Sequence, residues 1–374
     1  MNKPLASDYF IGMMTGTSLD GLDAVLVDFS QAKPVVLDSV ALAYPPALKA
    51  EMLALQAGSH GLGINELHRS RVAGIELSHL HASAITQLFK SSGLARKDIA
   101  AIGVHGQTVR HHPNCNAPYT VQLIDAATLA ESTRCTVISD FRARDIAAGG
   151  QGAPLVPAFH AALCAALPKP AALVNIGGFA NVTLLHANGD VQGFDTGPGN
   201  VLMDAWIALH YGKPYDTQGA WAASGTVNAE LLKRLLAHPY FAQPLPKSTG
   251  REAFNIAWLD ACLEGSDIEI ADEQATLCEL SAQSIAHAVL QHQADCQHVY
   301  VCGGGALNTH LMQRLQALLP CPVRMSDALG VAPQHMEALA FAWLARQCLL
   351  GLPSNAPSVT GALGLRVLGT ITPA

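Results

Sequence analysis

One segment near the start of the sequence constrains the fold more than any other. Residues 12–28 read GMMTGTSLDGLDAVLVD, a turn rich in Gly, Thr, Ser and Asp between two apolar runs. This pattern predicts a β-hairpin whose strands include residues 9–11 and 24–27. Glycines let backbone N–H groups approach a ligand, and hydroxyls add donors, so the turn suits a phosphate. The plain alternative is a glycine-rich β-turn with aspartate caps, and the segment alone favours neither. The residues concerned are Gly12, Gly16, Gly21, Thr15, Thr17 and Ser18.

Two aspartates in this turn, Asp20 and Asp23, carry the wrong charge to contact a phosphate directly. Carboxylates are ligands that a hydrated Mg²⁺ accepts beside a phosphate. We therefore expect a magnesium ion here, with Asp20 binding it through water.

The length and composition indicate two α/β domains. The chain has 374 residues, of which half are hydrophobic and 14% are charged. Such a length exceeds one compact core, and such a composition fits strands buried on both faces. No uninterrupted apolar stretch reaches the roughly 18 residues of a membrane span. Residues 1–4 lead directly into the first predicted strand, so we expect no signal sequence. We expect no membrane association and a cytoplasmic location.

The net charge and the spacing of cysteines and histidines argue against a nucleic-acid-binding protein, a disulfide-bonded protein and a zinc protein. The net charge is −7, so the chain lacks the excess of positive charge with which proteins bind nucleic acid. The nine cysteines contain no C-x-x-C pair, so we expect free thiols that are mostly buried. The histidines show no metal-ligand spacing, which argues against a structural zinc site.

The hairpin pattern returns in the second half of the chain. Residues 171–176, 182–185 and 191–194 are predicted strands, with Gly177 and Gly178 in the first turn. Two such hairpins, each followed by strands and helices, imply a duplicated α/β architecture with a cleft between the halves.

A glycine-rich stretch at residues 140–154 is the expected passage between domains. We therefore expect an N-terminal domain over residues 1–140 and a C-terminal domain over residues 141–349. The tail, residues 350–374, is expected to pack back on the first domain. The other predicted elements are strands at 35–42, 99–104, 119–123, 136–139, 298–302 and 322–325, and helices at 48–94 (broken near 58–61), 125–132, 156–166, 201–211, 228–237, 253–264, 273–291, 308–319 and 337–349.

Three consecutive glycines, Gly303, Gly304 and Gly305, follow the predicted strand at 298–302 and precede a helix. This geometry lets the backbone lie against a flat or charged ligand at a helix N-terminus. Neither G-x-G-x-x-G nor a P-loop is present. The plain alternative is a glycine-rich turn from strand to helix.

Asp195 follows the predicted strand at 191–194 and precedes a helix. A carboxylate there lies at the C-terminal edge of a sheet, where open α/β folds bind ligands. Its alternative role is to cap the helix. Because Asn200 is better placed to cap, we interpret Asp195 as functional.

These features together match an ATP-dependent phosphotransferase. The first turn and a second turn containing Asn175, Gly177 and Gly178 supply two phosphate-facing loops, and the three glycines supply a nucleotide edge. Phosphoryl transfer chiefly needs positioning and charge neutralisation, which such loops provide. Candidates for binding a polar substrate are His105, Gln107, Arg142 and Glu337. Their plain alternatives are a core histidine, a surface ion pair for the arginine and a helix cap for the glutamate.

Several motifs in combination resemble the 1,6-anhydro-N-acetylmuramic acid kinase family, and the resemblance covers residues 11–369. The motifs are GMMTGTSLDGLD (12–23), HGQT (105–108), DFR (140–142), GGQGAPLVP (149–157), NIGG (175–178), FDTGPGN (194–200) and VCGGG (301–305).

The resemblance implies the sugar kinase, Hsc70 and actin (ribonuclease H-like) superfold, with two duplicated α/β domains around an interdomain ATP cleft. It implies a bacterial enzyme of peptidoglycan recycling that is typically a homodimer. Its reaction opens the anhydro ring with ATP and water and phosphorylates O6, and ATP and Mg²⁺ are expected. Asp195 matches the base that activates the water. Thr15 stands where many members have Ser. The residues matching the ATP-phosphate motif are Gly16, Thr17, Ser18, Leu19, Asp20, Gly21, Leu22 and Asp23.

Two other functions remain open at this point. An ordinary sugar or acetate-type kinase on the same fold would use Asp195 to deprotonate a substrate hydroxyl. A nucleotide-dependent switch of the actin and Hsc70 type would need a further peptide-binding module or a polymer interface.

Overall fold

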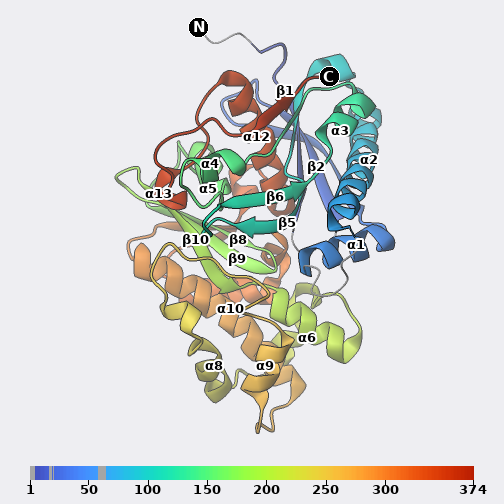
Figure 1. The fold of residues 1–374 in the computed structure, drawn as a ribbon. Coiled ribbons are helices and arrows are strands. Elements are labelled where there is room, and N and C mark those ends of the chain that lie inside the picture. The colour runs from blue at the N-terminus through green and yellow to red at the C-terminus, as the bar shows by residue number, and fades with distance from the viewer. Residues whose placement is uncertain (1–4, 17–18, 20, 58–64) are drawn as a thin grey trace. The chain divides into compact units, whose positions relative to one another are not determined.

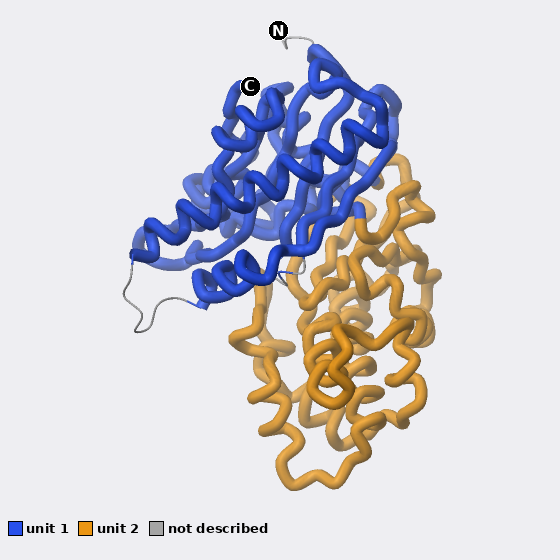
Figure 2. The backbone as a smooth tube through the Cα atoms, turned by 90° about the vertical axis from the view of Figure 1, so that its right-hand side faces the viewer, with its two compact units in different colours: residues 1–163, 335–374 blue, residues 164–334 orange. Residues whose placement is uncertain are grey.

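The computed structural model describes residues 5–16, 19, 21–57 and 65–374. The chain divides into two compact units, residues 1–163 with 335–374 and residues 164–334 (Figure 2). The boundaries expected from the sequence, after residues 140 and 349, differ from these. Helix α5 (Val156–Leu163) contacts α12 (Met336–Leu350), and α12 packs on the sheet of the first unit, so both helices belong there.

The first unit contains a six-stranded mixed sheet. In sheet order its strands are β13 (Thr370–Thr372), β7 (Val137–Ser139), β4 (Ile99–Val104), β1 (Tyr9–Thr15), β2 (Gly21–Asp28) and β3 (Val35–Ala43). The predicted hairpin is confirmed, because β1 and β2 pair antiparallel. Strands β4 and β7 then extend the sheet in parallel, and β13 closes the edge antiparallel.

The second unit repeats this arrangement in a five-stranded sheet. In sheet order its strands are β10 (Val191–Pro198), β9 (Phe179–Leu185), β8 (Ala171–Ile176), β11 (His298–Cys302) and β12 (Val323–Met325). Strands β8, β9 and β10 form an antiparallel meander, and β11 and β12 continue from β8 in parallel. This matches β3–β2–β1–β4–β7 in order and direction, so the predicted duplication is confirmed.

Helices cover both faces of the first sheet (Figure 1). Alternate side chains of β1, such as Ile11 and Met13, form a core with α2 (Glu66–Ser92) and α3 (Ala126–Thr133). On the other hand, α12 contacts β1, β4 and β2. Helix α2 begins where the Asn65 side chain accepts from the His68 N–H, and it ends at Gly93. The first unit also contains the helices α1 (Pro46–Ala57), α4 (Ala143–Ala147) and α13 (Pro357–Thr360). A separate two-stranded antiparallel ribbon consists of β5 (Gln107–His112) and β6 (Tyr119–Leu123).

A large apolar core holds the second unit together. Helix α10 (Ile270–His292) packs against β9 and β10 and contributes side chains such as Leu277 and Ile285 to this core. The unit's other helices are α6 (Val201–Tyr211), α7 (Ala220–Ser224), α8 (Ala229–Leu236), α9 (Ile256–Leu263) and α11 (Thr309–Leu318), with 3₁₀ turns that include η3 (Pro239–Ala242) and η4 (Gly304–Leu307).

The cysteine prediction is confirmed, because every cysteine is a free thiol and all but Cys115 and Cys262 are buried. Within the described residues, no helix combines the length and apolar character that crossing a bilayer requires.

Helix α12 approaches the first sheet at two glycines. Gly12 of β1 and Gly103 of β4 are register partners. A Cβ on Gly12 would lie 1.9 Å from the Ala338 carbonyl oxygen, and one on Gly103 would lie 2.1 Å from that of Phe341. The freedom of Gly12 therefore serves helix packing rather than a ligand.

We expect Gly12→Ala to destabilise the first unit, because α12 must retreat from the sheet to admit the methyl group. The free energy of unfolding should fall by about 3 kcal/mol or more, and the melting midpoint by roughly 6 °C or more. Calorimetry measures both. The matched control is Gly74→Ala in α2, where the nearest atom to the new Cβ is 3.8 Å away. It should stabilise by up to about 1 kcal/mol, and equal effects of the two variants would contradict the packing argument.

Candidate active site

Asp195 lies within a strand rather than after its end. The predicted strand stopped at residue 194, but β10 continues to Pro198, with a register shift between Asp195 and Gly197. A bulge of this kind redirects a side chain next to a functional site. Gly197 fits this local geometry, because a Cβ on it would lie 2.8 Å from the Phe241 ring.

The backbone and side chain of Asp195 are held by a distant segment. The Asp195 N–H donates to the Lys247 carbonyl oxygen at 3.3 Å, and the Tyr240 hydroxyl donates to the Asp195 carbonyl oxygen. The Thr249 N–H donates to Oδ2 at 3.0 Å. Burial raises the pKa of Asp195 to about 6, the Thr249 N–H lowers it, and the Glu252 carboxylate raises it further. A carboxylate with this pKa can act as a general base near neutral pH.

The expected cap at Asn200 is not formed. The Asn200 side chain makes no capping hydrogen bond, and its Nδ2 donates to the Gly177 carbonyl oxygen at 3.1 Å. The backbone N–H groups of Gly199 and Asn200 donate to the carbonyl oxygens of Gly178 and Gly177. Asn200 therefore fastens the Gly177–Gly178 turn to the start of α6, and Asp195 does not cap this helix either.

The structure brings the three-glycine turn beside the second hairpin. Gly303 has a φ of +79°, and a Cβ there would lie 2.4 Å from Asn175 Oδ1. A Cβ on Gly305 would lie 2.3 Å from the Ile176 side chain, whereas Gly304 has open space around it. Close packing alone thus explains why Gly303 and Gly305 have no side chain. Gly304 is the residue of this turn that is exposed.

The helix after these glycines, α11, spans Thr309–Leu318 and so confirms the helix predicted over residues 308–319. The 3₁₀ turn η4 intervenes, and the Asn308 side chain caps α11 by accepting from the Leu311 N–H at 3.0 Å. The glycines therefore do not form the helix N-terminus directly, and their contact with a nucleotide stays a prediction.

The first turn is only partly described. Thr17, Ser18 and Asp20 lie outside the described residues. Their neighbours Leu19 and Leu22 are buried in apolar clusters, so their side chains do not face a ligand. The other predicted positions in this turn are Gly16, whose carbonyl accepts from the Leu19 N–H, and Gly21, where a Cβ would lie 2.2 Å from the Leu42 carbonyl oxygen.

The Thr15 hydroxyl also has a partner within the protein. It donates to the Gly106 carbonyl oxygen at 2.7 Å, so it is not a free donor for a phosphate.

His105 and Arg142 form a pair in the first unit. Arg142 Nε and Nη2 lie 3.0 and 2.9 Å from His105 Nε2, and Nη1 donates to the Gly152 carbonyl oxygen at 2.7 Å. Burial and the positive charge of Arg142 hold the pKa of His105 well below its usual value. His105 is therefore a neutral acceptor that fixes the guanidinium, and neither plain alternative describes the pair.

Further charged groups lie around Arg142. Burial raises the pKa of Glu337, although Arg142 lowers it, and Asp23 raises it further. Burial raises the pKa of Asp23, which the neighbouring His335 lowers. Burial lowers the pKa of Arg142 to about 10, while Glu337 and Asp145 raise it. Glu337 is in the first turn of α12, so helix packing brings it to this group.

Gln107 has an amide Nε2 donor that forms no hydrogen bond with the described residues. It is fully buried, and its Oε1 accepts from the Tyr44 hydroxyl at 2.9 Å. Its Nε2 is buried without a hydrogen-bond partner among the described residues. A buried donor in this state fits a ligand group, because leaving it unpaired costs stability.

Asp145 organises the loop that carries Arg142. This fully buried carboxylate accepts from the Gly152 N–H at 2.8 Å, from Asn355 Nδ2 at 2.9 Å and from the Thr360 hydroxyl at 2.9 Å. It therefore joins the glycine-rich loop to the C-terminal tail. The expected packing of this tail on the first unit is consistent with these contacts.

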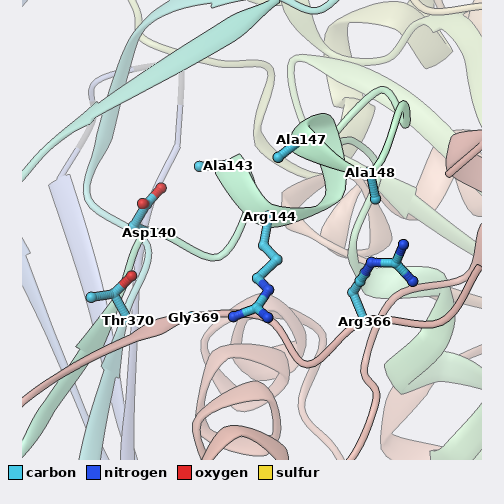
Figure 3. A pocket seen from close by; sticks show the side chains of 8 residues that line it. All are labelled: Asp140, Ala143, Arg144, Ala147, Ala148, Arg366, Gly369 and Thr370. Atoms are coloured by element: carbon cyan, nitrogen blue, oxygen red, sulfur yellow. The ribbon is translucent and has the colours of Figure 1, made fainter. Parts of the chain in front are cut away.

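A cavity of about 370 Å³ lies between the segment around α4 and the C-terminal tail of the first unit (Figure 3). Arg144 and Arg366 line it together with Asp140 and the backbone near Gly369. None of the predicted site residues lines this cavity.

Sequence reasoning missed the residues that hold Asp195. Tyr240, Lys247, Thr249 and Glu252 lie 45 to 57 positions away, and no spacing rule links them to a strand carboxylate. The only signal was a polar, glycine-containing stretch at residues 246–252.

Comparisons with known proteins agree along nearly the whole chain. A family model described as anhydro-N-acetylmuramic acid kinase matches residues 8–374. A relative of that name from Nitrosospira multiformis is 52% identical over 367 residues, which covers 98% of this chain and 99% of the relative. Another, from Variovorax paradoxus, is 51% identical over 379 residues and covers 99% and 100%.

Solved structures show looser similarity. A ROK family glucokinase from Streptomyces griseus, in complex with glucose and AMPPNP, has 13% sequence identity and a TM-score of 0.41, covering 91% of this chain and 99% of that one. An activator of 2-hydroxyisocaproyl-CoA dehydratase from Clostridium difficile, with bound ADPNP, has 15% identity and a TM-score of 0.44, covering 91% and 95%. Similarity at this level identifies no activity.

We expect Asp145→Ala to release the tail from the Arg142 loop, because three buried donors lose their acceptor. The free energy of unfolding should fall by about 3 kcal/mol. Hydrogen–deuterium exchange should show lost protection over residues 353–369. The control Asp190→Ala removes an exposed turn carboxylate that accepts from Asn188 Nδ2, and it should leave that protection unchanged. Intact protection in Asp145→Ala would refute the anchoring role.

Proposed function

Because this chain belongs to the anhydro-N-acetylmuramic acid kinase family, we propose that it converts anhydro-N-acetylmuramic acid, ATP and water into N-acetylmuramic acid 6-phosphate and ADP. The observation that carries the proposal is identity of about half the residues to relatives of this name over nearly the whole chain. The family match over residues 8–374 supports it. The reaction belongs to peptidoglycan recycling.

We assign Asp195 as the general base. Water attacks C1, its proton passes to the Asp195 carboxylate, and the bond from C1 to the bridging oxygen breaks. That oxygen becomes O6 and attacks the γ-phosphoryl group of ATP, from which ADP leaves. The half-buried position of Asp195 and its pKa of about 6 support this role, because the carboxylate is ionised near neutral pH and can accept a proton.

Residues of the first unit are assigned to the sugar. The unpaired Nε2 of Gln107 can donate to a substrate oxygen, and Glu337 can accept from a substrate hydroxyl. Arg142, fixed by His105, supplies a positive charge to an anionic group. These assignments rest on the geometry within the unit.

The nucleotide is assigned to the two hairpin turns and the exposed Gly304. Mg²⁺ would neutralise charge on the ATP phosphates. Asp23 fits such an ion, because the residue is solvent-accessible, although neighbouring groups partly desolvate its carboxyl, and no described residue donates a hydrogen bond to it. Mg²⁺ usually takes one or two carboxylates and keeps several waters. Accordingly, no cluster of three or more acidic, His or Cys side chains is needed, and none gathers in the described part of the chain. Asp20, the magnesium ligand predicted from the sequence, lies outside the described residues and remains the first candidate, with Asp23 as the second. We also infer a cytoplasmic homodimer.

Asp195→Asn should abolish turnover while ATP still binds, because the amide keeps the shape but cannot accept the proton. The fall in kcat should be on the order of 10² to 10⁴. A coupled ADP assay with anhydro-N-acetylmuramic acid measures turnover, and calorimetry measures ATP binding. Ordinary N-acetylmuramic acid is the control substrate and should be phosphorylated poorly. Retained activity in the variant would refute Asp195 as the base.

Reaction in ¹⁸O-labelled water should place one label on C1 of the product, because water attacks that carbon. Mass spectrometry of the early product measures it, and N-acetylmuramic acid 6-phosphate kept in the same labelled water without enzyme is the control for exchange at the free anomeric carbon. An ordinary sugar kinase, in which Asp195 deprotonates a substrate hydroxyl, would leave C1 unlabelled. An unlabelled product would therefore favour that second candidate.

A further inference from the structure

Asp195 has one carboxylate oxygen held and one left open. Oδ2 accepts from the Thr249 N–H, while no described residue donates to Oδ1. The Thr249 hydroxyl is itself buried without a partner among the described residues, so the backbone N–H is the group of Thr249 that contacts the carboxylate. This arrangement fixes the orientation of the carboxylate and leaves Oδ1 as its acceptor.

A second carboxylate lies close to the same segment. The Glu252 side chain folds back over the turn, so that a Cβ on Gly250 would lie 2.4 Å from Glu252 Oε2. The backbone N–H groups of Ala253 and Phe254 donate to the Gly250 carbonyl oxygen and hold this turn. The Glu252 carboxylate is therefore held over Gly250, the residue that follows Thr249, whose N–H binds Asp195.

The other groups that face Asp195 are engaged elsewhere. Lys247 Nζ lies 3.4 and 3.3 Å from the carbonyl oxygens of Tyr240 and Phe241 and 4.8 Å from the centre of the Tyr240 ring. On α10, His292 stacks on Phe194, and on β9 the register partner is the uncharged Asn181. Among the described residues, Glu252 is thus the charge that acts on Asp195, and it opposes the Thr249 N–H.

We propose that Thr249 and Glu252 are positioning residues for Asp195. The Thr249 N–H holds Oδ2 so that Oδ1 is presented to the attacking water, and the Glu252 carboxylate keeps Asp195 ready to accept a proton. This inference rests on the proposed role of Asp195 as the base.

The two residues act on Asp195 with opposite sign, which gives a specific test. The Thr249 N–H favours the ionised carboxylate, and a neighbouring negative charge disfavours it. Activity requires the ionised form, so it falls as pH drops through the pKa of Asp195. Removing the Glu252 charge should move this acidic limb to lower pH, and removing the Thr249 N–H should move it to higher pH.

The experiment measures kcat and kcat/KM against pH for the full-length protein with anhydro-N-acetylmuramic acid and ATP. Glu252→Gln should shift the acidic limb of kcat/KM downward. Thr249→Pro, which lacks the N–H, should shift it upward and lower kcat on the order of 10- to 100-fold, with KM for ATP unchanged. Thr249→Ala keeps the N–H and should keep the wild-type limb. Glu264→Gln, which removes an exposed charge at the end of α9, is the charge control.

The outcomes separate the two proposals. If the acidic limb of the pH profile of kcat/KM does not move in Glu252→Gln, the positioning role is overturned. This outcome decides the matter even if Thr249→Pro does not fold. Shifts of Glu252→Gln and Thr249→Pro in the same direction also overturn it. Full activity of Asp195→Asn would instead overturn the proposed base, and an inactive Asp195→Asn with an unmoved limb in Glu252→Gln refutes only the positioning role.

Discussion

The backbone contact of α12 with the first sheet is the constraint on which the first unit depends. Gly12 and Gly103 are partners on neighbouring parallel strands, so their missing side chains leave one strip along which the helix lies. Because Glu337 is in the first turn of α12, this packing carries it from the far end of the sequence to Asp23 and Arg142. A side chain at either glycine would push the helix away and separate these charges.

Much of the fold could be predicted because its signals are local. The two hairpins show a glycine-rich turn between apolar runs, and the sheets share one order and one pattern of directions. The short strand β13 and the ribbon strand β5 escaped prediction, since tertiary pairing rather than sequence pattern defines them. The domain boundaries differed for the same reason. The sequence does not say that α12 returns to the first sheet, and its contacts with β1, β4 and β2 in the structure show that it does.

Site residues could be predicted where the residue itself stands out in the sequence. They were missed where their role depends on a hydrogen-bond partner that only the fold brings close. Asp195 directly follows a predicted strand, and Arg142 stands in a cluster of Asp and Arg residues near the expected passage between domains, so sequence alone singled them out. The strand bulge at Asp195 and the change of role of Asn200 depend on hydrogen bonds formed in three dimensions. Thr249 acts through its backbone N–H, which every residue except proline carries, and no sequence pattern can reveal such a role.

The surroundings of Asp195 explain why it is held by backbone groups rather than by a cation. A guanidinium or ammonium partner would lower the pKa of a carboxylate by about 1–3 units and weaken it as a base. The pKa of Asp195 instead rises from 3.8 to about 6. That shift corresponds to about 3 kcal/mol of stability, lost as pH rises through this range because the buried group must ionise in the folded state. At neutral pH the second unit therefore holds an ionised and partly desolvated base, which is the state that proton abstraction requires.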